Sequence, residues 1–77
     1  MKLEILSPDK NLYKGEARSV FLPGKDGSLG ILENHAPLIT TLRKGTIRIE
    51  NDKGTEQFEV NGGVVEVLKN KVIILAE

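Results

Sequence analysis

Residues 45–60 read GTIRIENDKGTEQFEV, an alternation of apolar and polar side chains that is interrupted once, by the turn residues Asn51-Asp52-Lys53-Gly54. A period of two is typical of a β-strand with one buried face. The short turn predicts that the two halves pair as an antiparallel hairpin. The residues expected on its core face are Ile47, Ile49, Phe58 and Val60.

The same alternation, broken by glycine, proline and asparagine turns, recurs along the rest of the chain. It predicts strands near residues 2–7, 11–16, 17–23, 28–32, 38–42, 45–51, 55–61, 63–69 and 71–76. Many short strands with regular turns are typical of a sandwich or a barrel. Helical spacing competes only in residues 37–43, where the β-branched Ile39-Thr40-Thr41 favours a strand.

Structural turns are expected at five positions in particular, namely Gly24, Gly30, Pro37, Gly62 and Gly63. The pair Gly62-Gly63 indicates either a tight turn or a point where another backbone passes close by. Whether that backbone belongs to the same chain does not follow from the sequence.

The charge balance and the missing residue types narrow the function classes. Eleven basic and eleven acidic side chains cancel, which argues against binding to a nucleic-acid backbone. The chain has no cysteine and one histidine, so neither a disulfide framework nor a metal site is expected. The apolar run at residues 72–76 is far shorter than the ~20 residues that cross a bilayer. We expect a soluble protein without cofactor or metal, which meets a membrane only through another protein.

Two segments admit a catalytic or phosphate-binding interpretation beside a structural one. The glycine-rich run from Gly24 to Gly30 could cradle a phosphate, but such a loop needs a following helix, and here the pattern continues as strand. A pair of turns is the alternative. His35 could form an acid–base pair with Glu33. The sequence indicates no nucleophile beside them, so a structural or interface role for His35 is favoured.

Lys53 supports a different class of function. Lipoyl and biotinyl carrier domains are small β structures that display a lysine on such a hairpin turn. The same Asp-Lys-Gly composition also suits an ordinary solvated turn. A prosthetic-group carrier is therefore the alternative to the interpretation that follows.

Residues 22–38 read LPGKDGSLGILENHAPL. This segment closely resembles the signature of the epsilon subunits of F-type ATP synthases, in which a glycine-turned loop is followed by Leu-Gly-Ile and then His-Ala-Pro-Leu. The resemblance continues through residues 6–8 and 13–16 before it, and through residues 44–48, 62–67 and 72–76 after it. It covers nearly the whole chain.

The resemblance implies that residues 1–77 form one epsilon-type domain, an all-β, flattened, antiparallel two-sheet β-sandwich of ~8–10 short strands. It implies a non-catalytic rotor subunit in the central stalk, which couples the c-ring to the gamma subunit during proton- or sodium-driven ATP synthesis. Its place would be the cytoplasmic face of the inner membrane, as a peripheral part of the complex.

The resemblance also implies two sets of contact residues. The c-ring would be met by Lys25, Asp26, Gly27 and Ser28, and gamma by Ser7, His35, Ala36 and Leu38. Many family members carry an acidic residue at the position of Ser28, so Asp26 beside it is expected to take over that charge contact. The family's C-terminal helical hairpin has no counterpart in these residues. If Glu77 is the natural end, this predicts coupling without inhibition through that hairpin; if the chain is a piece of a longer one, the inhibitory part lies outside it.

Overall fold

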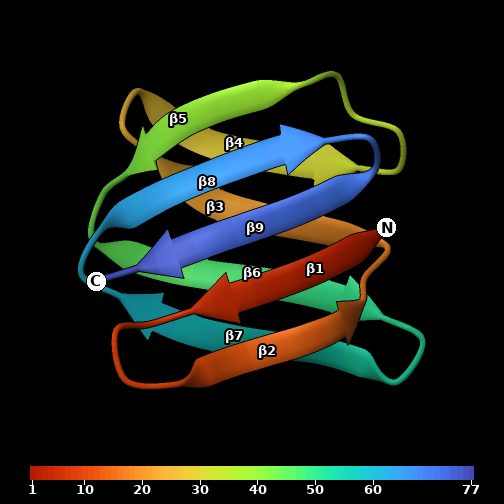
Figure 1. The fold of residues 1–77 in the computed structure, drawn as a ribbon, viewed down its shortest axis with the longest axis horizontal. Helices are drawn as coiled ribbons and strands as arrows, with labels where there is room; N and C mark the ends of the chain where they lie inside the picture. Colours follow the sequence, from red (N-terminus) through yellow and green to blue (C-terminus); the bar gives the residue numbers. More distant parts are fainter.

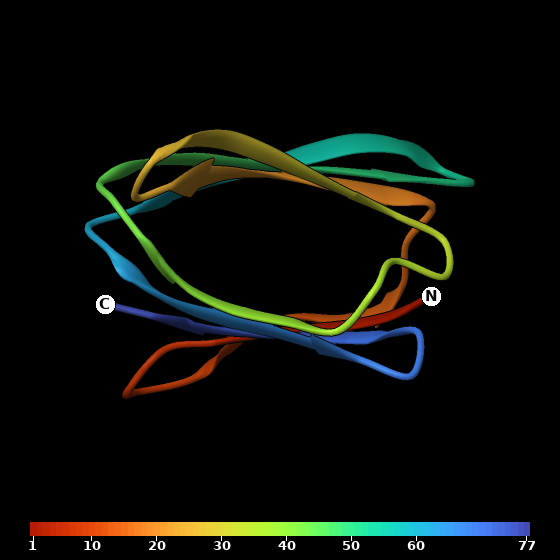
Figure 2. The same ribbon diagram turned by 90° about the horizontal axis from the view of Figure 1, so that it is seen from above.

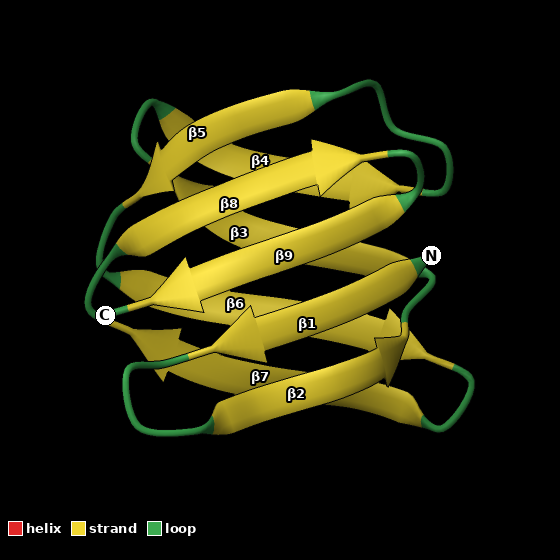
Figure 3. Cartoon of the chain, in the orientation of Figure 1, coloured by secondary structure: helices red, strands yellow, loops and turns green.

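Every regular element of the chain is a β-strand (Figures 1 and 3). A computed structural model describes residues 1–77. Its strands are β1 (Lys2–Leu6), β2 (Asn11–Glu16), β3 (Ser19–Gly24), β4 (Gly27–Leu32), β5 (Leu38–Leu42), β6 (Gly45–Asn51), β7 (Gly54–Val60), β8 (Gly63–Leu68) and β9 (Lys71–Ala76). The all-β prediction is confirmed, and residues 38–42 form a strand rather than a helix.

The strands are arranged in two layers, which face each other in the view of Figure 2. The first layer has the order β2-β1-β9-β8-β5, and the second has the order β4-β3-β6-β7. The single residue pair Gly24 and Leu42 joins β3 to β5, so the hydrogen-bonded ladder passes from one layer to the other there. The result is the expected flattened sandwich, with extents of 26 × 24 × 18 Å.

Strand pairing is antiparallel except between β1 and β9, which run parallel. The sequence predicts antiparallel pairing because short turns connect consecutive strands. β1 and β9 lie at opposite ends of the chain, and no short turn constrains their relative direction. Lys2 pairs with Lys71 and Leu6 with Leu75 in this parallel ladder.

The core lies between the layers and consists of the inward members of each alternation. Its buried apolar residues are Met1, Leu3, Ile5, Ala17, Val20, Leu22, Ile31, Leu42, Ile47, Ile49, Val60, Val65, Val67, Val72, Ile74 and Ala76. Most are β-branched or leucine side chains, which pack well on a pleated surface. The predicted core face of the β6–β7 hairpin is confirmed, with Phe58 half-buried against the core.

Side chains bridge the layers on the side away from β5. The rings of Tyr13 in β2 and Phe58 in β7 meet edge to face, with centroids 6.2 Å apart and an interplanar angle of 73°. Asn51 donates a hydrogen bond from Nδ2 to the Tyr13 hydroxyl at 3.1 Å. These contacts connect the edge strands β2 and β7, which are not paired to each other.

Gly63 lies where two backbones approach closely. Its φ is 147°, and an added Cβ would lie 2.3 Å from the carbonyl oxygen of Leu75 in β9. The close backbone at Gly62-Gly63 therefore belongs to the chain itself.

The prediction of a turn at Gly30 is wrong. Gly30 lies inside β4, directly opposite Phe21 in β3, and an added Cβ would lie 3.3 Å from the Phe21 ring. The missing side chain at Gly30 leaves room for the aromatic ring across the ladder. Glycine is favoured at such a close contact as well as in a turn, so the sequence pattern alone does not distinguish the two.

Candidate functional site

The outward surface of the first layer carries a group of exposed apolar side chains. Ile39 is 70% exposed, Leu75 53% and Leu68 49%. We define the outer face as these residues together with Val64, which is also exposed, and Ile73, which is half-buried. A group of exposed apolar side chains on neighbouring strands indicates contact with another macromolecule.

The alternation along the strands produces this surface. In β8, Val65 and Val67 point into the core, so Val64, Glu66 and Leu68 point outward. In β9, Val72 and Ile74 are buried, so Ile73 and Leu75 point outward. Both strands therefore carry apolar side chains on both faces, although Glu66 and Lys71 also point outward, and a strand with one solvated face does not need such outward apolar side chains.

The predicted c-ring residues Lys25, Asp26, Gly27 and Ser28 form the turn between β3 and β4. The Lys25 amide donates to the Thr41 carbonyl oxygen at 3.0 Å, and the Arg43 amide donates to the Pro23 carbonyl oxygen at 2.8 Å. These bonds attach the turn to β5. No helix follows it, because β4 begins at Gly27, so the arrangement required of a phosphate loop is absent.

The four predicted gamma residues all adjoin the first layer, but they do not form one cluster. Ser7 follows β1 and lies at the end of the sandwich that also carries the β3–β4 turn. His35 and Ala36 precede β5 at the opposite end. Leu38 is half-buried and packs against the core.

A hydrogen-bonded network holds the loop that contains His35. The Met1 ammonium contacts the Glu33 carboxylate at 2.5 Å and donates to the Ala17 carbonyl oxygen at 3.0 Å. Asn70 donates to the other Glu33 oxygen at 3.0 Å and accepts from the Asn34 amide at 2.8 Å. The network joins the start of β1, the β4–β5 loop and the β8–β9 turn.

The network changes the pKa of both charged partners. The hydrogen bond from the Met1 ammonium, with the Asn70 amide second, lowers the pKa of Glu33. The hydrogen bond to Glu33 raises the pKa of the Met1 amine against the opposing effect of burial. The Glu33 carboxylate is therefore paired with the Met1 ammonium, while His35 Nδ1 lies 2.7 Å from the Ala36 carbonyl oxygen. The two residues do not form an acid–base pair.

Lys53 lies exposed in the β6–β7 turn, as the hairpin predicts. Its backbone amide donates a hydrogen bond to Asn51 Oδ1 at 2.8 Å, and such a bond is typical of an asparagine-initiated turn. No group of three or more His, Asp or Glu side chains is placed to hold a metal ion. A helix able to cross a membrane is also absent from the structure.

Ile39 is the most exposed residue of the outer face, and its outward position was not predicted from the sequence. Leu38 and Ile39 are adjacent and both apolar, so periodicity alone does not say which one is buried. The register of β5 against β8, with Leu38 opposite the buried Val67, turns Leu38 inward and Ile39 outward.

Comparisons with known proteins agree with this architecture. Residues 1–77 match the family described as the ATP synthase delta/epsilon chain, beta-sandwich domain. The ATP synthase epsilon chain of Sulfurimonas denitrificans is 53% identical over 78 aligned positions, which cover the whole chain and 60% of that protein. The chain thus spans about 60% of the length of this curated relative.

Two solved assemblies contain a chain of the same fold. One is the Euglena gracilis mitochondrial ATP synthase, OSCP/F1/c-ring (TM-score 0.89, 23% identity, 96% of this chain and 48% of that chain). The other is the Tetrahymena thermophila mitochondrial ATP synthase, central stalk/c-ring (TM-score 0.83, 20% identity, 97% and 61%). At these identities the two structures establish the fold. The family match over every residue and the 53% identical relative establish the lineage, and the chain belongs to the delta/epsilon family of ATP synthase chains as their beta-sandwich domain.

Proposed function

We propose that this chain is a central-stalk rotor subunit, which couples the c-ring to the gamma subunit during ion-driven ATP synthesis and catalyses no reaction itself. In this role it is held at the membrane by its partners, on the side where the catalytic head lies. The observation that carries the proposal is the exposed apolar outer face on a chain of this family. Apolar area that is left exposed is stabilised when a partner covers it.

The geometry suits contact with two partners at once. The outer face is the broad side of the first layer, whereas the turn at Lys25, Asp26, Gly27 and Ser28 is at one end of the sandwich. We assign the broad side, with the flanking residues Ser7, His35, Ala36 and Leu38, to gamma, and the end turn to the c-ring. A rigid sheet between these contacts transmits torque because its interior is closely packed.

Gamma binding tests the first assignment. Ile39→Asp places a charge on the outer face and should weaken association with the gamma chain of the same synthase by at least about tenfold. Gln57→Asp is the matched control, since Gln57 is an exposed residue of β7 in the other layer. Circular dichroism should find both variants folded. Equal binding by both variants, or no binding by the unchanged chain, would contradict the proposal.

Docking to the ring tests the second assignment. Asp26→Lys should weaken association of the gamma complex with detergent-solubilised c-ring by a few-fold, because an exposed ion pair contributes only ~0 to 1 kcal/mol. Asp52→Lys, in the turn at the opposite end, should leave docking unchanged. A loss of docking with Asp52→Lys alone would indicate that the c-ring contacts that end of the sandwich instead.

A further inference from the structure

The outer face carries its charges in a definite order along the strands. Cross-strand partners form three rows. The neutral row is Thr41, Val64, Leu75 and Leu6. The acidic row is Ile39, Glu66, Ile73 and Glu4. The basic row is Leu68, Lys71 and Lys2. The edge strand β2 adds the opposite charges Lys14 beside Glu4 and Glu16 beside Lys2. The charges that have no register partner of opposite sign are therefore Glu66 in the acidic row and Lys71 in the basic row.

Glu66 is the free charge of the acidic row. It is exposed, yet it takes part in no ion pair or side-chain hydrogen bond. Its direct cross-strand neighbours are the apolar Ile39 and Ile73. Glu4, in contrast, lies 3.9 Å from the ammonium of Lys14. A carboxylate between two isoleucines loses contact with water when a partner covers it, so a cation on the partner favours that docked arrangement.

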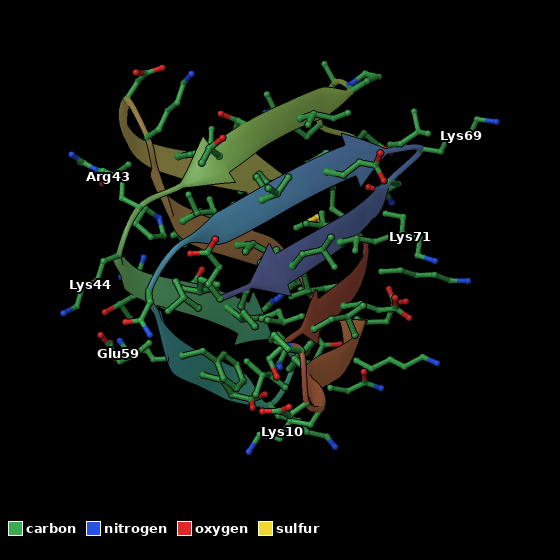
Figure 4. The ribbon with its side chains drawn as sticks, turned by 60° about the vertical axis from the view of Figure 1, so that its left-hand side comes forward. Lys10, Arg43, Lys44, Glu59, Lys69 and Lys71 are labelled. Atoms are coloured by element: carbon green, nitrogen blue, oxygen red, sulfur yellow. The ribbon has the colours of Figure 1, made fainter.

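The basic row places two like charges directly opposite each other. Lys2 and Lys71 are register partners in the parallel ladder, and like charges directly opposite each other are unfavourable. Glu16 in β2 lies opposite Lys2 on its other side, whereas the other register partner of Lys71 is the apolar Leu68. Neither lysine forms an ion pair. Lys69 and Lys71 extend outward from the same end of the sandwich in Figure 4. A hollow of about 590 Å³ opens there, with Lys2, Glu66, Leu68, Lys71 and Ile73 among its lining residues.

The proposed function names the occupant of this face, which is the gamma chain. A complementary gamma surface would place a basic group opposite Glu66 and an acidic group opposite Lys71.

We propose that the order of Glu66 and Lys71 on the outer face determines which way round the gamma chain docks. This inference rests on the proposed function. Apolar contact is non-directional, so the isoleucine, valine and leucine side chains alone would accept gamma in more than one orientation. Charges that are desolvated on docking penalise every orientation that brings like charges together. Glu66 and Lys71 thus determine the orientation in which gamma docks, while the apolar side chains supply most of the affinity.

A charge swap tests the order without changing the net charge. Glu66→Lys combined with Lys71→Glu should weaken gamma binding by at least about tenfold. The difference from the unchanged chain should shrink as salt is raised, because salt screens the charged contacts. Lys44→Glu combined with Glu59→Lys is the matched control, since both residues are exposed and lie away from the outer face (Figure 4). It should bind within about twofold of the unchanged chain.

The single neutral variants Glu66→Gln and Lys71→Gln keep the test valid if the swap fails to fold, and each should lose a few-fold in affinity. Binding of the swap equal to that of the unchanged chain would overturn the inference and leave the rotor function standing. Absence of gamma binding by the unchanged chain would overturn both. A face-to-face dimer of the unchanged chain in sedimentation, dispersed by Ile39→Asp, would show that a second copy covers the face and would overturn the inference.

Discussion

Gly63 and Leu75 belong to neighbouring strands whose backbones meet so closely that a Cβ on Gly63 would lie 2.3 Å from the Leu75 carbonyl oxygen. This contact occurs where β8 begins, opposite the end of β9. The same end of the first layer carries the junction between β3 and β5. Gly63 is the register partner of Leu42, the residue of β5 at that junction.

Gly63→Ala should therefore be strongly destabilising. The added methyl group meets backbone that cannot move without breaking the ladder, and φ is unfavourable for alanine as well. We expect a loss of at least about 3 kcal/mol in the free energy of unfolding, measured by denaturant titration. Gly54→Ala separates the two causes, because its φ of 124° is also positive but its Cβ would meet nothing. That variant should lose only about 1 to 2 kcal/mol. Equal losses would show that the close contact is unimportant.

Stability should depend on pH through Met1 and Glu33. Because the folded state raises the pKa of the Met1 amine, its contribution is complete below the unfolded value of ~8 and is lost as the pH rises through the folded value. Because the folded state lowers the pKa of Glu33, its contribution is complete above the unfolded value of ~4.3 and is lost as the pH falls through the folded value. The stabilisation is thus greatest between these limits.

Glu33→Gln should abolish the dependence at the acidic end, since it removes the Glu33 carboxylate, and should reduce it at the basic end, since Glu33 is the largest cause of the raised Met1 pKa and Glu16 remains. Glu59→Gln, at an exposed carboxylate that contacts Thr46 rather than Met1, should preserve the profile. Denaturant midpoints measured across the pH range provide the comparison. An unchanged profile in Glu33→Gln would contradict the role of the network.

The guanidinium of Arg48 lies over the Phe21 ring, 4.5 Å from its centroid. The two residues are register partners in β3 and β6, and the absence of a side chain at Gly30 admits the ring on its other side. A double-mutant cycle with Arg48→Met and Phe21→Leu should give a coupling energy of about 0.5 to 1 kcal/mol. A coupling of zero would mean that the ring and the cation contribute independently.

The orientation of β5 can be tested by stability alone. Ile39→Asp should change the free energy of unfolding by less than about 1 kcal/mol, because the side chain already lies in water. Leu42→Asp should prevent folding, because Leu42 is only 4% exposed and would bury an unpaired charge. Thermal unfolding of the two variants is sufficient to compare their stabilities. A severe loss in Ile39→Asp would place that residue in the core.

The sequence by itself determined the strands, the hairpins and the core face of the β6–β7 hairpin. Alternation along a strand is a local property, so Ile47 and Ile49 could be assigned to the core, and β6 could be paired with β7 across a four-residue turn, without coordinates. The family motifs likewise reside in consecutive residues, and they predicted the lineage that the comparisons establish.

Only the tertiary structure decided the features that join distant parts of the chain. The parallel pairing of β1 with β9, the contact of Met1 with Glu33 and the outward position of Ile39 all depend on which strand lies beside which. The order of charges on the outer face has the same origin, since Lys2 and Lys71 become neighbours only across that parallel ladder. Periodicity specifies a face for each strand, whereas the composition of a surface depends on how several strands are placed in register.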